Sequence, residues 1–307
     1  MKKLIVSLSA IIVVLSSCNN NSEKYSLKPN MKAGESYTME YKMEFDQDAM
    51  GMKNEMLMSI GYLMKIKNVT PQQDIDMDFM YNKMVMEMKS KMFSVSYNSD
   101  STYSSEENPA DPGQSMRKMY AGIMGWLINK PIQITLDSSG QVKQVTGYRE
   151  LIKAMHDSMS SASGTNNEAV ADMMGEKQIN QVFQQTFGTF PKKPVGIGEE
   201  WTSEINITQS SMLMKYKNTY KITEILKKEN EALIDVKGVI SMGVDPAKKG
   251  VNIDAKGTLT GNMTVDLNTG LVKTGKQKVD IKMEIAMMDK KVPMTMNGII
   301  TLKGKKL

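Results

Sequence analysis

The chain has 307 residues, enough for one large domain or two small ones with a sizeable core. Its 39 Lys and Arg residues against 34 Asp and Glu residues give a net charge of +5, too small to favour nucleic acid as the main partner. The one cysteine excludes an internal disulfide framework and a cysteine-cluster metal site. The one histidine excludes most of the usual acid–base and metal chemistry, so we expect no cofactor.

The N-terminus has the pattern of an export signal. Lys2 and Lys3 precede an apolar run over residues 4–17, which is shorter than the roughly 20 residues that a membrane-spanning helix needs. This run ends in the sequence LSSC, at Cys18, which resembles the bacterial lipobox. The resemblance implies cleavage before Cys18 and attachment of diacylglycerol to its thiol, and two or more acyl chains anchor a protein stably. We therefore expect residues 1–17 to be a lipoprotein signal peptide and Cys18 to be the lipid attachment site.

Residues 18–30 are expected to form a lipidated tether. After the cysteine the chain continues with NNNSEK, which is polar and has no apolar pattern. An asparagine directly after the lipidated cysteine resembles lipoproteins that are sorted to an outer membrane. We therefore expect a lipid-anchored protein of the outer membrane in the cell envelope. The sequence leaves open whether it faces the periplasm or the cell exterior.

Alternation of apolar and polar residues dominates the rest of the chain. Over residues 37–45 tyrosine, methionine and phenylalanine occupy the odd positions, and threonine, glutamate and lysine the even ones. Residues 75–88 alternate in the same way, but the apolar positions change parity near Asn82, as a β-bulge or turn would cause. Further strands are predicted at 56–66, 214–222, 234–240, 251–267, 279–287 and 294–302. Strands with one apolar and one polar face are typical of an antiparallel sheet.

Three segments have helical spacing instead. Apolar residues follow one helix face over 116–127, and two more such stripes lie between residues 150 and 190. We expect a helical insert at 113–129 and bridging helices over 150–190. Because the apolar face of the sheet must be covered, these helices are its available cover. The predicted fold is α+β: a curved, mostly antiparallel open half-barrel with about three helices on its concave face.

The chain also contains similar segments. AGESYT (33–38) resembles IGEEWT (197–202), and ITLDSSGQVK resembles TVDLNTGLVK further along. We interpret residues 31–307 as a single domain built from two related half-sheets, 31–150 and 195–307. Chance similarity between two β-rich segments is the alternative.

Several runs resemble a known group of proteins. GESYTMEYKMEF, NKPIQITLDSSGQVKQVTG and FPKKPVGIGEEWT, together with the methionine-alternating strands, resemble an uncharacterised family of outer-membrane lipoproteins common in Bacteroidota. The resemblance covers residues 27–307. It implies an outer-membrane lipoprotein and supplies no catalytic residues, because the family has no assigned activity. In architecture the chain also resembles the open half-barrels that carry lipoproteins or lipids through the bacterial envelope.

The 31 methionines pose the main chemical question. They could fill the core, because methionine is apolar and adaptable, or form a deformable lining for acyl chains. They could also bind Cu(I) or serve as sacrificial sites of oxidation. The alternating methionines of residues 84–88 stand about 7 Å apart along one strand side, so they cannot all bind one ion without a bend. We predict that six methionines point to the covered face and line a ligand site: Met39, Met43, Met58, Met84, Met86 and Met88.

Other candidate residues have simpler interpretations. His156 is expected at the polar border of a helix, and no nucleophile motif accompanies it. Asp74, Asp76 and Asp78 share one strand face, but the spacing of a calcium-binding loop is absent, so a solvated face is the better interpretation. The sequence therefore predicts no catalytic residue and no metal site.

The sequence favours a binding protein over an enzyme. We expect a non-catalytic, membrane-anchored lipoprotein that binds a lipid or another apolar ligand between sheet and helices. A structural or interaction lipoprotein with a solid core is the alternative, and Cu(I) binding by methionine is a minor one. The sequence indicates no nucleic-acid partner and identifies no protein partner.

Overall fold

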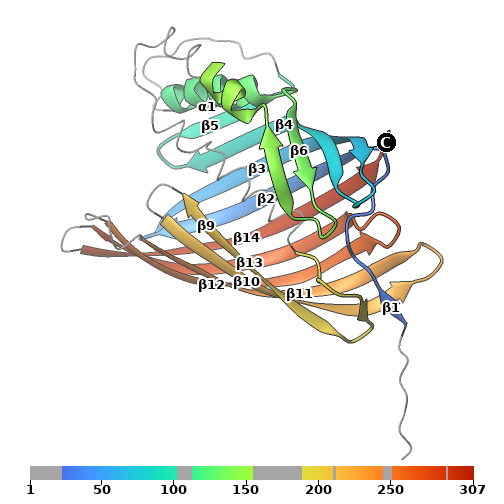
Figure 1. The fold of residues 1–307 in the computed structure, drawn as a ribbon. Coiled ribbons are helices and arrows are strands. Elements are labelled where there is room, and N and C mark those ends of the chain that lie inside the picture. The colour runs from blue at the N-terminus through green and yellow to red at the C-terminus, as the bar shows by residue number, and fades with distance from the viewer. Residues whose placement is uncertain (1–22, 102–112, 155–188, 210–211, 245–250, 288–289) are drawn as a thin grey trace, which may run out of the picture.

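The protein is built around one large β-sheet. The computed structural model describes residues 23–101, 113–154, 189–209, 212–244, 251–287 and 290–307. These residues form an open antiparallel sheet of 12 strands and a separate two-stranded ribbon (Figure 1). Helical residues in this described part are α1 Gln114–Leu127 and residues 148–154. The fold is therefore nearly all β, and the prediction of an α+β fold with about three helices on the concave face was wrong.

The strands of the large sheet come from two parts of the chain, residues 36–146 and residues 200–306. The first part supplies β2 Ser36–Ala49, β3 Met52–Val69, β4 Ile75–Ser90, β5 Ser94–Asn98, β6 Ile132–Leu136 and β7 Val142–Thr146. The second supplies β9 Glu200–Gln209, β10 Met212–Leu226, β11 Glu231–Val244, β12 Val251–Asp266, β13 Val272–Met287 and β14 Lys290–Lys306. The ribbon consists of β1 Lys24–Tyr25 and β8 Val195–Gly196.

The last strand joins the two parts into one sheet. The strand order is β7-β6-β4-β3-β2-β14-β13-β12-β11-β10-β9, with β5 also pairing with β4. Strand β14 pairs with β2 from Met294 opposite Ala49 to Lys306 opposite Tyr37. The first and last long strands are therefore central neighbours, and β7 and β9 are the edges of this order.

The parity change predicted in residues 75–88 is confirmed as a β-bulge. Tyr81 pairs with Tyr62 and Lys83 pairs with Gly61, so Asn82 is the extra residue of β4. A Cβ atom on Gly61 would lie 2.6 Å from the Oδ1 atom of Asn82, so a side chain there would displace the Asn82 amide. The bulge keeps the apolar side chains before and after it on the same face of the sheet.

Glycines on the apolar face allow strands β11 to β14 to curl. These glycines are Gly238, Gly257, Gly261, Gly275, Gly298 and Gly304. At Gly298 a Cβ atom would overlap the ring of Phe45 from β2, and at Gly261 it would overlap the carbonyl oxygen of Lys276 from β13. A side chain at either position would push the neighbouring strand away. The sheet can therefore bend into the open trough that Figure 1 shows.

The curled sheet covers its own apolar face. A single hydrophobic core takes buried side chains from both parts of the sheet, including Tyr37, Met64, Met77, Ile222, Ile234 and Val265. Leu27 and Met31, which precede β2, are buried in the same core. Among the described residues, side chains from both walls of the trough share this core, so the sheet itself covers the apolar face there. This is the physical reason why the predicted α+β fold was wrong.

The helix expected at 113–129 is present as α1, but it covers only one flank of the sheet. Leu127 of α1 is buried against Met84 of β4 and Tyr97 of β5. Of the bridging helices predicted over 150–190, residues 148–154 are helical, and residues 155–188 lie outside the described part. His156 and Cys18 also lie outside it. Within the described residues, no helix has the length and apolar character needed to cross a membrane.

The similar segments AGESYT and IGEEWT form matching turns. Gly34 and Gly198 both have positive φ angles, of 86° and 83°. Their N–H groups donate to the carbonyl oxygens of Ile66 and Ile222 at 2.9 and 2.8 Å. In both turns the glutamate that follows accepts a hydrogen bond from the backbone N–H three residues earlier, at 2.8 and 2.9 Å. The division into half-sheets 31–150 and 195–307 stays a prediction.

Candidate functional site

The six methionines predicted to line a ligand site share the apolar face of the sheet. Met43 pairs with Met58, and Met58 pairs with Met86, so these three form one row across β2, β3 and β4. Met39 and Met84 are buried, with exposed fractions of 3% and 7%, whereas the other four are half-buried. All six methionines therefore lie on the expected face, two of them buried and four half-buried. Their contact with a ligand stays a prediction.

The apolar face changes in character along the strands. Where Leu27 and Met31 pack, it is filled by buried branched, aromatic and methionine side chains, such as Ile66, Leu136 and Ile222; we call this the closed end. We call the opposite end, where the β2–β3 hairpin turns, the open end. Described methionines at half-buried positions of this face towards the open end are Met43, Met56, Met58, Met86, Met88, Met214, Met242, Met283, Met294 and Met296.

This gradient has a mechanical consequence. Branched and aromatic side chains have few accessible rotamers, so they pack the closed end rigidly. Methionine is unbranched with a polarizable thioether, and it adapts to irregular surfaces. The open end therefore combines partial exposure with deformable side chains. Sequence alternation predicted the direction of these side chains, but their partial exposure depends on the curvature of the whole sheet.

An aromatic group borders the methionine rows. The ring centroids of Tyr62 lie 5.6 Å from Tyr41, 5.2 Å from Phe79 and 5.7 Å from Tyr81. Burial raises the pKa of Tyr81 to about 12. Burial also raises the pKa of Tyr62, so both phenols are neutral at physiological pH and contribute apolar surface with hydroxyl groups rather than an acid or base.

A partly exposed ionic contact lies at the closed end. The carboxylate of Glu35 accepts hydrogen bonds from Lys306 Nζ, Tyr37 Oη and the backbone N–H of Lys32. Burial favours the neutral acid, but these hydrogen bonds and the charge of Lys306 outweigh it and lower the pKa of Glu35 to about 2. Burial and the hydrogen bond to Glu35 raise the pKa of Tyr37. The contact joins the last strand to the start of the first long strand, so its role is structural.

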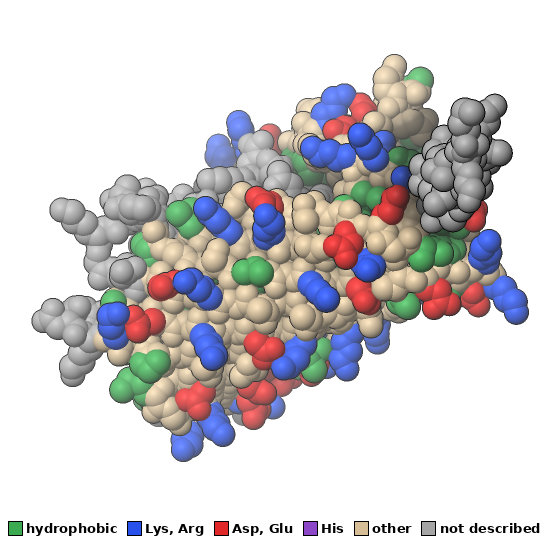
Figure 2. Space-filling model, turned by 90° about the horizontal axis from the view of Figure 1, so that it is seen from below, with side chains coloured by type: hydrophobic (Ala, Val, Ile, Leu, Met, Phe, Trp, Pro, Cys, Tyr) green, Lys and Arg blue, Asp and Glu red, His purple; other side chains and the backbone are tan. Residues whose placement is uncertain are grey.

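The outer face of the sheet is charged, in contrast to the apolar face. Figure 2 shows lysine, arginine, aspartate and glutamate side chains of both signs interspersed over the underside of the molecule. Asp76 and Asp78 of β4 lie on this face, and Asp74 directly precedes the strand. Asp74 pairs with Lys143 at 2.5 Å, Asp76 accepts a hydrogen bond from Thr135 at 2.7 Å, and Asp78 pairs with a lysine at 3.3 Å. These partners fit a solvated face better than an ion site.

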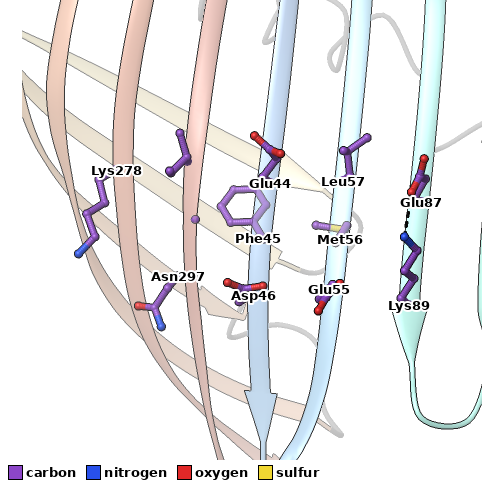
Figure 3. Close-up of a pocket in the computed structure, with 12 residues that line it drawn as sticks. Glu44, Phe45, Asp46, Glu55, Met56, Leu57, Glu87, Lys89, Lys278 and Asn297 are labelled. Carbon is purple, nitrogen blue, oxygen red and sulfur yellow. Dashed lines mark ion pairs between the residues drawn. The ribbon is translucent and has the colours of Figure 1, made fainter.

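A groove of about 530 Å³ lies near the open end, across β4, β3, β2, β14 and β13 (Figure 3). Its carboxylates are Glu44, Asp46, Glu55 and Glu87, and its apolar side chains include Leu57 and Ile299. Glu87 forms an ion pair with Lys89 at 3.4 Å. Sequence analysis missed this groove, because its residues come from five strands and no local pattern groups them. Among the residues that the structure describes, no cluster of three or more His, Cys, Asp or Glu side chains could hold a metal ion.

The fold has distant likenesses among solved structures. Lipovitellin, from a structure concerned with lipid–protein interactions, matches with a TM-score of 0.46 and 10% identity. That match covers 89% of this chain and 25% of that chain, so the protein spans about a quarter of it. An outer membrane channel from Pseudomonas putida F1 matches with a TM-score of 0.23 and 5% identity, over 90% of this chain and 97% of that one. OpdQ from Pseudomonas aeruginosa matches with a TM-score of 0.22 and 8% identity, over 90% and 100%. At these TM-scores the likenesses carry no argument about function.

The family of this protein follows from its amino-acid sequence. No curated protein matches the chain. A model of a family of unknown function, DUF6263, matches residues 72–272, which include β4 to β12 and α1. Since the match extends over more than half of the sequence, this protein belongs to the family of unknown function DUF6263.

Proposed function

We propose that this protein is a membrane-anchored envelope lipoprotein that holds a lipid or another apolar ligand on the open end of its apolar face. The observation that carries the proposal is the change along that face from buried side chains to half-buried methionines. Leaving apolar surface in water costs about 25 cal/mol per Å², and large exposed apolar surfaces mark binding sites. A ligand with acyl chains would remove this surface from water, and the methionines would adapt to its shape. The proposed function is sequestration without covalent chemistry.

The proposed anchor is Cys18, as the lipobox resemblance implies, and the asparagine that follows it favours the outer membrane. The described chain begins at Glu23, and the β1–β8 ribbon follows at once. Strand β8 leads into the turn at Gly198, which bonds to Ile222 at the closed end of the sheet. The tether therefore meets the domain at the closed end, so that an anchor at Cys18 would leave the open end free.

Ligand binding can be tested with two neighbouring substitutions on β3. Met58 is half-buried on the apolar face, and Leu57 is half-buried on the outer face. We expect Met58→Glu to lose most bound ligand, because a carboxylate in the apolar lining opposes acyl-chain binding. The matched control Leu57→Glu should retain the ligand. The measurement is native mass spectrometry of protein extracted from membranes in mild detergent, with titration by cis-parinaric acid, a fluorescent fatty acid, as a second readout.

The binding experiment needs a folding control, and one outcome would contradict the proposal. Circular dichroism of both variants checks that the sheet is intact. Wild-type protein that carries no ligand and fails to bind cis-parinaric acid would contradict the proposal. It would favour the alternative of a structural or interaction lipoprotein, for which the groove on the outer face would be the docking surface.

The anchor is tested separately by Cys18→Ser. In cells fed labelled palmitate, we expect the wild-type protein to incorporate label and to sediment with membranes. The Cys18→Ser protein should incorporate no label and should appear in the soluble fraction, because no thiol remains for lipid attachment. Equal labelling and sedimentation of the two proteins would contradict the proposed anchor.

A further inference from the structure

The outermost turns of the open end expose methionine side chains. Met50, in the turn between β2 and β3, and Met52, the first residue of β3, have exposed fractions of 70% and 55%, and Met92, between β4 and β5, is 78% exposed. Asn54 of β3 pairs with Ser90 of β4, so the two turns lie side by side. We call Met50, Met52 and Met92 the methionine rim. Exposed apolar side chains that gather at one place usually mark a contact surface.

The backbone of the first turn makes Met50 unusual. Met50 and Gly51 have positive φ angles of 54° and 82°, as in the primed turns that connect hairpins. The first of these positions normally holds asparagine, aspartate or glycine, because other side chains cost about 1 kcal/mol there. Met50 accepts this strain while 70% of its surface is exposed. Packing within the fold therefore does not explain the residue, and strained residues without a structural reason mark functional sites.

The second turn holds Met92 in a fixed position. Ser90 Oγ accepts hydrogen bonds from the backbone N–H groups of Met92 and Phe93, at 3.1 and 3.0 Å. The backbone N–H of Ser90 donates to the carbonyl oxygen of Phe93 at 2.9 Å. These bonds order the turn, so the exposure of Met92 is built into the structure rather than the result of a loose loop.

Lysines flank the rim. Lys53 follows Met52, Lys91 precedes Met92, and both lysines are exposed. Of the nearby acids, Asp48 lies opposite Lys53 and accepts a hydrogen bond from the N–H of Gly51 at 2.8 Å. Asp46 and Glu55 lie opposite each other further back along β2 and β3, and Glu87 of β4 pairs with Lys89. Apolar side chains at the tip with lysines beside them are typical of segments that sit in the interface of an anionic bilayer.

We propose that the methionine rim docks onto a lipid bilayer with anionic headgroups. The side chains of Met50, Met52 and Met92 would enter the interface, and Lys53 and Lys91 would contact the headgroups. The inference stands on the two turns and does not depend on a bound ligand. The rim and the closed end lie at opposite ends of strands of 14 to 18 residues, which span about 45–60 Å. The rim would therefore add a second membrane contact to the proposed anchor.

The test uses the mature chain, residues 18–307, with Cys18→Ser, so that no acyl group contributes. Binding is measured by co-sedimentation with vesicles of phosphatidylethanolamine and phosphatidylglycerol, and with vesicles of pure phosphatidylcholine. The test variant is Met50→Asn/Met52→Asn/Met92→Asn. The matched control is Ile197→Asn/Val239→Asn, because these side chains are also exposed, at 55% and 59%, but lie elsewhere.

We expect the wild-type protein and the control to bind the anionic vesicles, more weakly as salt is raised, and to bind phosphatidylcholine less. The triple variant should bind at least tenfold more weakly, because three apolar side chains no longer enter the interface. Equal binding by the triple variant, or an equal loss in the control, would overturn the proposal. Vesicle binding by Met58→Glu should match the wild type, which separates this result from the fate of the proposed ligand site.

A single substitution distinguishes docking from a purely structural role. Asparagine tolerates a positive φ angle, so Met50→Asn should raise the thermal midpoint while it weakens vesicle binding. A higher midpoint with unchanged binding would assign Met50 no membrane role and would count against the rim. The direction of the two effects is opposite, so loss of binding in this variant cannot come from loss of folding.

Discussion

At the scale of single residues, the apolar face contains one tight contact that sequence patterns do not reveal. Asn218 of β10 is 9% exposed, and its side-chain N–H donates to Tyr220 Oη at 3.1 Å. Its Oδ1 atom has no hydrogen-bond partner in the described structure, and it lies over Gly238 of β11. A Cβ atom at Gly238 would overlap that oxygen. The glycine therefore provides the space for a buried amide.

This contact predicts the result of two glycine substitutions on β11. Gly238→Ala should lower the free energy of unfolding by about 1–3 kcal/mol, because the new methyl group displaces the Asn218 amide. Gly243→Ala is the matched control, since the nearest atom there is 3.9 Å from the added Cβ. Adding Asn218→Ser to Gly238→Ala should recover part of the loss. Urea unfolding measures all three, and equal effects of the two alanines would contradict the role given to Asn218.

At the scale of elements, local patterns predicted what depends on neighbours in the sequence. The long strands and α1 follow from apolar spacing, and the bulge at Asn82 was visible as a change of parity in β4. Gly140 and Gly270, in the connections that follow β6 and β12, have positive φ angles of 85° and 70° in the structure, as glycine allows. Pairing between distant elements could not be predicted in this way. Nothing in β14 or β2 alone indicates that they are partners, because alternation gives the faces of a strand but not its neighbours.

At the scale of the whole molecule, the sequence indicated an apolar face that needed cover but not what covers it. The sequence indicated helices as the cover. In the structure the sheet bends at glycines of the apolar face, and side chains from its two walls share one core. The same bending decides which methionines stay half-buried. The faces of the six predicted methionines were therefore predictable, and the separation of a closed end from an open end was not. The groove and the methionine rim depend on several strands or turns, so they also required the structure.

The ionic contact that joins the first and last long strands gives the molecule a predictable response to acid. The pKa of Glu35 is lowered from an ordinary value of 4.5 to about 2, so the folded state favours the charged carboxylate. This stabilisation is present above pH 4.5 and is lost as the pH falls through about 2. We expect Glu35→Gln to lower the free energy of unfolding near neutral pH, by about 1 kcal/mol because solvent screens the half-exposed Lys306, and the gap from wild type to shrink below pH 4.5.

Urea unfolding across this pH range measures the difference in stability between wild type and Glu35→Gln. The control is Glu199, in the turn that matches the turn at Glu35. Glu199 accepts a hydrogen bond from the backbone N–H of Gly196 and pairs with Lys24 at 2.9 Å, but its side chain is 40% exposed. Solvent screens such a pair, so Glu199→Gln should change stability little at any pH. If the gap between wild type and Glu35→Gln stayed constant from neutral pH down to pH 3, charge on Glu35 would not be what joins the two ends of the chain. Closure of the trough at that end would then depend on apolar packing in the shared core, to which Leu27 and Met31 contribute.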